Sequence, residues 1–353
     1  MISRTYGARA VSASTLEDRP VELQAKVAFL SGAESYPEGT LTVEVVETHM
    51  SFVFLTDHHA YKLKKPVCYE FLDFSTLAAR RADCLEELRL NRRLARDVYL
   101  DVVALTLAPG GSLQLAGEGE AVEWLVKMRR LPRELMLDHA MREQRVSRDE
   151  VRRFMRVLDD FYWAAQPVAM DPGVYRQRFE RDIRANRREL LDPDYELSPA
   201  LIETVTAGQL AALEQQAASF DRRVASGKIV EGHGDLRPEH VFLGPEPVFI
   251  DCLEFNRDWR LLDPVDEIAY LALECECAGA PWIGEAVLEI HREHTGDDPP
   301  AALVRFYKSC RATLRAKLSA WHLKDHVDPA DRTKWIARAQ RYLELAARYA
   351  SPS

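Results

Sequence analysis

A change in hydrophobic period near Pro132 is the feature that most limits how this chain folds. Before this residue, short runs rich in β-branched and aromatic residues are typical of consecutive antiparallel strands. The expected strands span 41–46, 51–56, 60–64, 102–107, 113–115 and 122–128. Residues 76–96 interrupt them with apolar positions at helical spacing, which predicts one amphipathic helix. We therefore expect a small α+β lobe over residues 1–131.

Beyond Pro132 the pattern is typical of helices, because apolar residues recur every three or four positions. The expected helices span 150–165, 175–191, 199–225, 266–277, 281–294, 300–323 and 331–349. Residues 230–256 are the exception, since they form short apolar segments punctuated by glycine and proline. The predicted fold class is α+β, with a small β-rich N-terminal lobe and a larger, mostly helical C-terminal lobe over residues 132–353.

The length and charge of the chain narrow its class. Its 353 residues are enough for two domains, and its net charge of −9 leaves no general positive field for a nucleic acid. The first twenty residues lack the apolar core of a secretory signal. The best membrane-span candidate, 268–290, contains several glutamates and a proline. We expect a soluble, cytoplasmic protein without a nucleic-acid or membrane partner, and its oligomeric state stays open.

The strongest chemical signal is a pair of aspartates sixteen positions apart, each on a short apolar hairpin. Asp235 lies in HGDLRPEHVFL, residues 233–243, and Asp251 follows the apolar run 248–250. Phosphoryl transfer needs one carboxylate that orients and deprotonates the attacking hydroxyl, and another that holds the metal beside the phosphates. Asp235 suits the first role and Asp251 the second. Each aspartate alone is also typical of a turn, and only the joint pattern points to chemistry.

The joint pattern also resembles a known family. The motif H-G-D-L-x-x-x-(N/H), followed by I-D-x-x-E, is similar to the aminoglycoside phosphotransferase-like, or choline kinase-like, family of the protein-kinase-like fold. Four segments resemble an uncharacterised bacterial branch of it: ETH at 47–49, AYKLKKP at 60–66, ELRLN at 87–91 and VKMRR at 126–130. Some members continue into a P-loop kinase-like domain, and none is expected here because the chain has no Walker motif. The resemblance implies a catalytic loop over 231–243, a metal-binding loop over 248–256, and ATP with Mg²⁺ as cofactors.

The resemblance places the nucleotide phosphates beside a lysine of the first lobe. Lys62 is the implied phosphate ligand, and Glu87 on the 76–96 helix is its implied ion-pair partner. Lys64 lies two positions further along the same strand face, and Glu86 adjoins Glu87. The choice between the two lysines and between the two glutamates is therefore open.

Three further residues are implied contacts of the nucleotide. Ser51, in the turn 48–51, would offer its hydroxyl and the neighbouring amides to the phosphates. That turn lacks the glycines of protein kinases, which predicts a looser approach of its backbone. Met128 and Arg130 lie in the linker between the lobes, where backbone groups would bind an adenine edge.

His240 is the main departure from the family motif, because most members have asparagine there. An amide oxygen suits Mg²⁺, whereas an imidazole nitrogen suits Mn²⁺ or Zn²⁺ better. We therefore expect His240 to be a conditional metal ligand, with Mn²⁺ as the alternative ion, or a hydrogen-bond donor to phosphate. A loop histidine that only packs is the other interpretation. Asp266 is the implied brace of the catalytic loop.

Charged residues of the second lobe give opposite indications about the phosphoryl acceptor. Two basic stripes follow helical faces, namely Lys308, Arg311 and Arg315, and Arg181, Arg184 and Arg188. Such stripes are typical of solvated faces, or alternatively of a patch for an anionic substrate. Three acids would instead suit a cationic substrate: Glu254, Glu274 and Glu276.

The predicted function is transfer of the γ-phosphoryl group of ATP to a hydroxyl of a small molecule. Only about fifteen residues separate Asp251 from the helix near Asp266, too few for the long segment on which protein kinases dock peptides. The alternative is a nucleotide-binding pseudokinase with a regulatory or scaffold role, favoured by the missing glycines and by His240. Transfer of AMP or phosphate to a protein is a third, weaker alternative.

Overall fold

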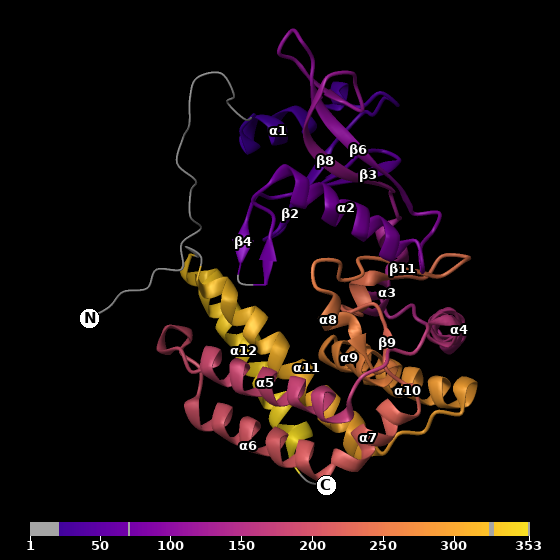
Figure 1. Cartoon of the computed structure of the whole chain (residues 1–353), viewed down its shortest axis with the longest axis vertical. Coiled ribbons are helices and arrows are strands. Elements are labelled where there is room, and N and C mark those ends of the chain that lie inside the picture. Colours follow the sequence, from indigo (N-terminus) through magenta and orange to yellow (C-terminus); the bar gives the residue numbers. More distant parts are fainter. Residues whose placement is uncertain (1–20, 70, 325–327, 352–353) are drawn as a thin grey trace. The chain divides into compact units, whose positions relative to one another are not determined.

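The structure is a computed structural model that describes residues 21–69, 71–324 and 328–351. The chain divides into two compact units, and each is described by itself (Figure 1). Among the described residues, the first unit holds those up to Leu135 together with Phe249–Arg257, and the second holds the remainder. The expected metal-binding loop therefore groups with the first unit, whereas the sequence boundary near residue 131 assigned it to the second lobe. The reason is the backbone hydrogen bonding of this loop, given below.

The first unit is built on a six-stranded antiparallel sheet with the order β1-β2-β3-β8-β6-β7. Its strands are β1 (Glu44–Glu47), β2 (Ser51–Leu55), β3 (His59–Lys64), β6 (Tyr99–Leu107), β7 (Leu113–Leu115) and β8 (Glu120–Arg129). A separate strand pair comprises β4 (Cys68–Tyr69) and β5 (Leu72–Asp73). The helices are α1 (Leu23–Leu30) and α2 (Leu77–Asn91), with 3₁₀ turns at Ala33–Ser35 and Arg133–Leu135.

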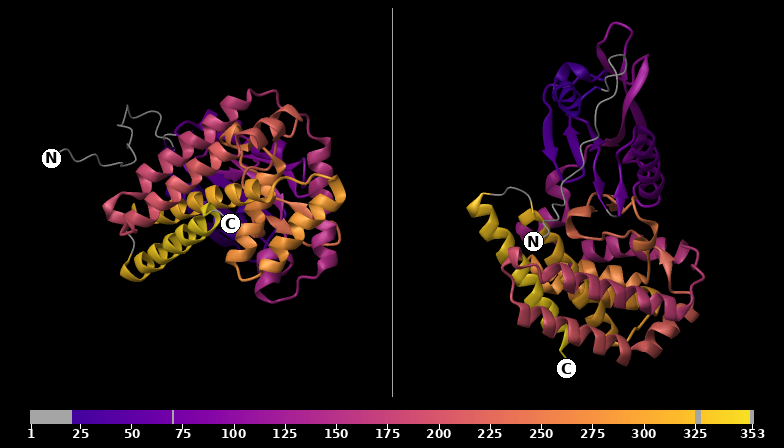
Figure 2. Two further views of the ribbon diagram at one scale, coloured as in Figure 1. Left: turned by 90° about the horizontal axis from the view of Figure 1, so that it is seen from below. Right: turned by 60° about the vertical axis from the view of Figure 1, so that its left-hand side comes forward.

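The side chains of β3 alternate between the two faces of the sheet. Tyr61 and Leu63 pack in a buried apolar cluster with Leu30 of α1. Lys62 and Lys64 therefore lie on the opposite face, which α2 covers, and Figure 2 shows the two helices on the two sides of the sheet. The sheet thus presents both lysines to one helix.

Local sequence fixes where α2 begins and which face it buries. The Thr76 side chain accepts a hydrogen bond from the Ala79 N–H at 3.1 Å, which caps the helix at its N-terminus. Buried side chains then recur at helical spacing, and they include Cys84, Glu87, Leu88 and Asn91. A glutamate is consequently placed in an otherwise mostly uncharged buried face.

The second unit is mostly helical. Its helices are α3 (Leu137–Arg142), α4 (Arg148–Ala164), α5 (Pro172–Leu190), α6 (Pro199–Gln215), α7 (Ala217–Ala225), α8 (Arg257–Arg260), α9 (Pro264–Cys277), α10 (Pro281–Thr295), α11 (Ala301–Trp321) and α12 (Pro329–Ala350). Short strands are β9 (Val230–Glu231), β10 (Val241–Phe242), β11 (Val248–Phe249) and β12 (Leu261–Leu262). The 3₁₀ turns are Pro193–Tyr195, Pro238–His240 and His322–Lys324. The single helix expected over 199–225 is two helices, because the chain leaves helical geometry at Gln216.

α9 is the central helix of this unit, since every residue from Pro264 to Cys275 is buried. Asp263 caps it by accepting a hydrogen bond from the Val265 N–H at 3.0 Å, with proline at the first helical position. α10 and α11 pack against α9, and α11 and α12 lie side by side (Figure 2). Acidic and aromatic groups of α9 are thereby buried next to the 231–243 loop.

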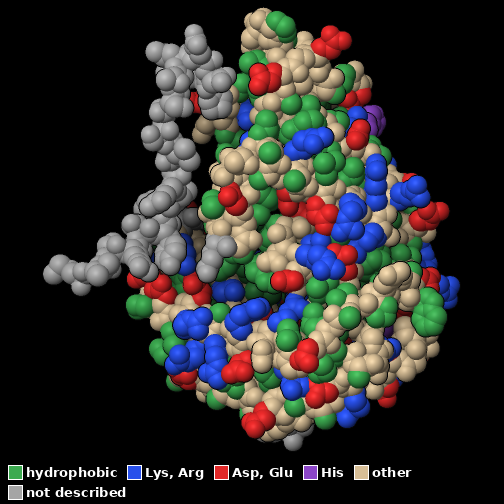
Figure 3. Space-filling model, viewed as in Figure 1, with side chains coloured by type: hydrophobic (Ala, Val, Ile, Leu, Met, Phe, Trp, Pro, Cys, Tyr) green, Lys and Arg blue, Asp and Glu red, His purple; other side chains and the backbone are tan. Residues whose placement is uncertain are grey.

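The predicted fold class is confirmed, because an antiparallel sheet forms the first unit and helices dominate the second. On the face drawn in Figure 3, positive and negative side chains alternate over the helical unit. Within the described ranges, no helix combines the length and the apolar character that crossing a bilayer requires.

Candidate active site

Lys62 on β3 joins two carboxylates of the first unit. Its ammonium group donates to Glu87 Oε1 at 2.9 Å and to Asp251 Oδ1 at 2.8 Å. Glu86, the alternative partner, instead binds Arg89 at 2.7 Å on the outer face of α2. Burial lowers the pKa of Lys62, but the charges of Asp251 and Glu87 outweigh it and hold that pKa well above the ordinary value.

Lys64 binds the same glutamate as Lys62, so both candidate lysines pair with Glu87. Its ammonium group lies 2.7 Å from Glu87 Oε2 and 2.6 Å from Asp83 Oδ2, and it also donates to Glu254. The side chain of Lys64 is only 1% exposed and that of Glu87 is fully buried. This arrangement buries Lys64 among three carboxylates and leaves Lys62 at the edge of the cluster, beside Asp251.

The loop that carries Asp251 is tied to the first unit through its backbone. The Asp251 N–H donates to the Tyr99 hydroxyl at 3.0 Å, and the Cys252 N–H donates to Asn91 Oδ1 at 2.9 Å. Asp251 itself has a φ of 62°, a left-handed conformation that aspartate tolerates better than most residues. These bonds attach the loop to α2 and β6, and its Asp251 carboxylate binds Lys62.

The exposed edge of this cluster suits an added cation. Lys62 and Lys64 together contact four carboxylates. The oxygens of Asp83, Glu87 and Glu254 lie within 4.8 Å of one another, but the Lys64 ammonium already sits among them. The Asp251 side chain is 44% exposed, and carboxylate oxygen is the ligand type that Mg²⁺ prefers. Asp251 therefore fits the predicted metal role.

The predicted phosphate turn uses part of its own backbone internally. The Thr48 N–H donates to the Ser51 carbonyl at 2.9 Å, and the Ser51 N–H donates to Thr48 Oγ1 at 3.0 Å. Ser51 is buried at the start of β2, opposite Lys64 in the strand register. These two amides are committed to the turn, which leaves them poorly suited to the phosphate contact expected of them.

The linker residues are likewise engaged in the sheet. Met128 lies in β8, paired with Ala60 on one side and Tyr99 on the other. The Arg130 N–H donates to the His58 carbonyl at 2.8 Å, and its guanidinium donates to the Thr56 carbonyl at 2.7 Å. Arg130 thus closes the β2–β3 turn, and its amide is not a suitable donor to an adenine edge.

In the second unit, Glu267 of α9 holds the start of the catalytic loop. Its carboxylate accepts hydrogen bonds from the His233 N–H at 3.0 Å, from the Gly234 N–H and from the Tyr162 hydroxyl at 2.7 Å. Gly234 has a φ of +91°, which only glycine adopts readily. The expected brace, Asp266, was the wrong neighbour, because its carboxylate points to α11 and binds Arg311 at 2.8 and 2.7 Å.

Asp235 follows directly after this clamp. Its carboxylate accepts from Arg237 Nε at 3.1 Å on one oxygen and from the Tyr270 hydroxyl at 3.4 Å on the other. The side chain is 31% exposed, which leaves it accessible to a substrate. Sequence reasoning did not single out Arg237 or Tyr270. Arg237 is only two positions from Asp235, whereas Tyr270 comes from α9.

His240 does not fit the predicted metal role. Its Nε2 lies 3.1 Å from Arg237 Nη2, and its Nδ1 lies 2.8 Å from the Asp235 carbonyl oxygen. A guanidinium can only donate, so Nε2 accepts and the proton resides on Nδ1. Both ring nitrogens of His240 therefore serve hydrogen bonds within the loop.

The stripe Lys308, Arg311 and Arg315 is neither a solvated face nor a substrate patch. Arg311 binds Asp266, Arg315 lies 3.3 Å from Glu274, and Lys308 lies 3.8 Å from Glu276. Glu274 and Glu276, two of the three acids that would suit a cationic substrate, are therefore paired with this basic stripe, which would itself suit an anionic substrate. The third, Glu254, is bound by Lys64. The other stripe, Arg181, Arg184 and Arg188, is exposed as a solvated face should be.

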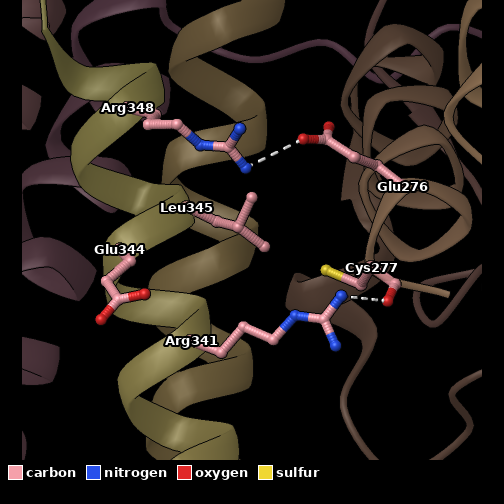
Figure 4. A pocket seen from close by; sticks show the side chains of 6 residues that line it. All are labelled: Glu276, Cys277, Arg341, Glu344, Leu345 and Arg348. Carbon is pink, nitrogen blue, oxygen red and sulfur yellow. Dashed lines mark hydrogen bonds and ion pairs between the residues drawn. The ribbon is translucent and has the colours of Figure 1, made fainter. Parts of the chain in front are cut away.

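A pocket of about 330 Å³ adjoins Glu276 (Figure 4). Figure 4 shows Arg348 paired with Glu276 and Arg341 donating to the Cys277 carbonyl across it, at 3.2 and 2.6 Å. Glu344 and Leu345 of α12 complete the lining. None of the 231–243 loop lines this pocket, and the charges of Arg348 and Glu276 in it are paired with each other.

The sheet with its buried lysine–glutamate pair, and the helical unit with its H-G-D-L loop, define a chain of the protein-kinase-like fold. A choline/ethanolamine kinase family protein from Mesorhizobium loti matches it with a TM-score of 0.50 at 14% identity, over 93% of this chain and 99% of that one. A thermostable mutant of an aminoglycoside phosphotransferase, in ternary complex with AMP-PNP and hygromycin B, matches with a TM-score of 0.50 at 12% identity, over 92% and 98%. The resemblance that the motifs predicted is confirmed at the level of the fold.

The relatives found by sequence are uncharacterised, so they assign no activity to this chain. Three uncharacterised proteins, one from Mycobacterium bovis and two from strains of Mycobacterium tuberculosis, are 31% identical over 282 residues. The match covers 78% of this chain and 54% of each relative, so the chain spans about half the length of the curated relatives it matches. No family model matches the chain.

Proposed function

We propose that the protein is an ATP-dependent phosphotransferase of the aminoglycoside phosphotransferase-like family, which moves the γ-phosphoryl group to a hydroxyl of a small molecule. The observation that carries the proposal is the Lys62 ammonium held between Glu87 and Asp251. A charged lysine fixed beside a partly exposed carboxylate is what a metal–triphosphate complex requires. The H-G-D-L loop, with Asp235 presented by the Glu267 clamp, supplies the second requirement.

Each residue has a defined role in this reaction. Lys62 binds the α and β phosphates, and Glu87 orients Lys62 through a fully buried ion pair. Asp251 would hold Mg²⁺, which when bound neutralises charge on the β and γ phosphates. Asp235 orients the acceptor hydroxyl and accepts its proton as the oxygen attacks phosphorus. A cytoplasmic location is part of this proposal, because the proposed phosphoryl donor, ATP, is available there.

The length of the segment after Asp251 supports a small acceptor. Between Asp251 and the start of α9 at Pro264, the chain has room only for α8 and the two-residue strand β12. No extended segment is present there to dock a peptide, within the part of the chain that the structure describes. The net charge of −9 further disfavours a nucleic-acid substrate.

A screen of hydroxyl metabolites for acceptor-dependent ADP release tests the proposal. The panel spans amino alcohols, sugars, nucleosides and aminoglycosides, because the acids and bases that suggested a substrate charge are paired internally. Asp235→Asn should lower kcat by roughly 10²–10⁴-fold while ATP still raises the melting temperature. Asp149→Asn, an exposed aspartate on α4, is the matched control and should leave turnover unchanged.

The pseudokinase alternative is favoured by one specific observation, the engagement of both His240 nitrogens within the loop. It predicts a thermal shift with ATP but no metal-dependent turnover with any acceptor. Turnover that depends on Asp235 excludes this alternative. Measuring the intact mass of the protein after incubation with ATP distinguishes the small-molecule kinase and the pseudokinase from a third alternative, transfer of phosphate or AMP to a protein side chain.

A further inference from the structure

The Arg237 guanidinium is the centre of a small network inside the catalytic loop. Its Nε donates to Asp235 Oδ2 at 3.1 Å, its Nη2 donates to His240 Nε2 at 3.1 Å, and its Nη1 binds Glu239. The side chain is 17% exposed, so it is ordered by these contacts and still reachable from solvent. Three partners on three nitrogens fix the plane of the guanidinium.

His240 contributes to this network as a neutral ring. Because the guanidinium has no acceptor, the His240 Nε2 lone pair receives its N–H, and Nδ1–H donates to the Asp235 carbonyl at 2.8 Å. A metal ion on Nε2 would have to displace the guanidinium. In most members of the family, this position supplies a second metal ligand. Here His240 instead holds an organic cation, the Arg237 guanidinium, in place.

We propose that Arg237 is the fixed cation that stabilises the transferred phosphoryl group in place of a second metal ion, and that His240 is the positioning residue that orients it. The inference rests on the proposed function and deepens it. It assigns to the catalytic loop an organic cation, the Arg237 guanidinium, at the position where most members of the family supply a second metal ligand.

The chemistry of the transfer explains why the guanidinium is suitably placed. The bond from the acceptor oxygen to Pγ forms while the bond from Pγ to the β–γ bridging oxygen breaks. The hydroxyl proton goes to Asp235 and ADP leaves with the electron pair. The acceptor oxygen must lie within hydrogen-bond reach of Asp235. A guanidinium bound to the same carboxylate is thus adjacent to the phosphoryl oxygens, where charge is spread in the transition state.

A direct test counts the metal ions without measuring activity. Native mass spectrometry of the protein with AMP-PNP and Mn²⁺ should show one Mn²⁺ per bound nucleotide. The double variant Arg237→Ala/His240→Asn, which restores the amide and removes the guanidinium, should take up a second. Two Mn²⁺ ions on the wild-type complex would overturn the inference alone. A wild-type protein that forms no AMP-PNP complex would overturn the proposed function, and the inference with it.

Kinetics separate a role in phosphoryl transfer from a merely structural role. Arg237→Met should lower kcat on the order of 10²–10³-fold with little change in the KM for ATP. Added guanidinium ion should partly restore the turnover of Arg237→Ala. Arg311→Met is the matched control, because Arg311 is equally held by a carboxylate but lies in the α9–α11 contact. It should lower the melting temperature and leave the kcat of the folded protein unchanged.

Variants of His240 complete the test. His240→Gln keeps an acceptor for the guanidinium and should retain more turnover than His240→Ala. Raising the Mg²⁺ or Mn²⁺ concentration should not restore His240→Ala, because the ring holds Arg237 and not a metal. Restoration by either ion, or an unchanged kcat in Arg237→Met, would overturn the inference.

Discussion

The charged cluster of the first unit and the charged network of the catalytic loop in the second unit differ in burial. In the first unit, Lys62 and Lys64 contact four carboxylates, of which Asp251 is by far the most exposed, at 44%. In the second unit, one guanidinium is held between Asp235 and Glu239 beside a neutral histidine. The first cluster thus buries most of its charged groups, whereas the second leaves its guanidinium 17% exposed and Asp235 31% exposed.

Burial determines what each of these two clusters contributes to the protein. Removing one partner of a buried ion pair leaves an uncompensated charge, which costs far more than losing an exposed pair. The lysine–carboxylate cluster is therefore expected to be part of what keeps the first unit folded. The partly exposed groups Asp235 and Asp251 are expected to affect turnover much more than stability.

The largest predicted effect comes from breaking the buried cluster. Lys64→Met would leave Asp83, Glu87 and Glu254 without their shared ammonium group. The free energy of unfolding, measured by urea titration, should fall by about 3–5 kcal/mol. Lys65→Met is the control, since Lys65 pairs with the exposed Glu47, and should cost less than about 1 kcal/mol. Equal losses in the two variants would contradict this account.

The next effect concerns the exposed edge of the same cluster. Asp251→Asn should raise the Mg²⁺ concentration for half-maximal activity roughly 10- to 100-fold, because an amide is a weaker ligand than a carboxylate. Its free energy of unfolding should change by less than about 1 kcal/mol, since the side chain is 44% exposed. An unchanged Mg²⁺ requirement would remove Asp251 from the metal site.

A smaller effect compares two neighbouring acids of α9. Glu267→Gln would turn an amide N–H towards groups that now donate to the carboxylate, and should cost about 1–3 kcal/mol and lower kcat. Asp266→Asn should reduce stability through the lost Arg311 pair and leave the kcat of the folded protein unchanged. Calorimetry with steady-state kinetics on both variants distinguishes the brace of the loop from the helix–helix contact.

The smallest effect is a pH dependence at Asp83. Burial raises the pKa of this carboxyl above its ordinary value of 3.8, despite the attraction of Lys64. A raised pKa in the folded state favours the protonated form, so its stabilising contribution is present below pH 3.8 and is lost as pH rises through the folded pKa. Asp83→Asn mimics the protonated group. As the pH rises from 3.8 through the folded pKa of Asp83, the free energy of unfolding of Asp83→Asn should therefore increase relative to that of the wild type. Urea titrations across this pH range measure the difference, and a decrease would refute the raised pKa of Asp83.

Several elements could be predicted because their signals are local. The strand 60–64 and the helix 76–96 were expected within a few residues of their observed bounds, since β-branched runs and helical spacing report on neighbouring residues. α1 was not expected, because its N-cap Glu22 makes no side-chain cap and the helix has only eight residues. The split of 199–225 at Gln216 was missed because no glycine or proline marks it.

The candidate site was predicted only in part. The pairing of Lys62 with Glu87 was implied by the family resemblance, and the structure shows that the second lysine, Lys64, shares the same glutamate. Glu267 was missed in favour of its neighbour Asp266, because the sequence does not show which of two adjacent acids faces the loop. The basic stripe of α11 has periodicity that fits a solvated face, and only its contact with α9 shows it to be paired.

The sequence by itself determined the order of elements, the shared face of Lys62 and Lys64, and the H-G-D-L loop with Asp235. These depend on residues a few positions apart, where backbone geometry fixes the direction of each side chain. Tertiary structure alone decided that Glu254 reaches Lys64 and that Tyr270 reaches Asp235. Pairing between charged or polar groups distant in the chain depends on how helices and strands pack. The periodicity of hydrophobic residues in the sequence does not predict which partner each of these groups has.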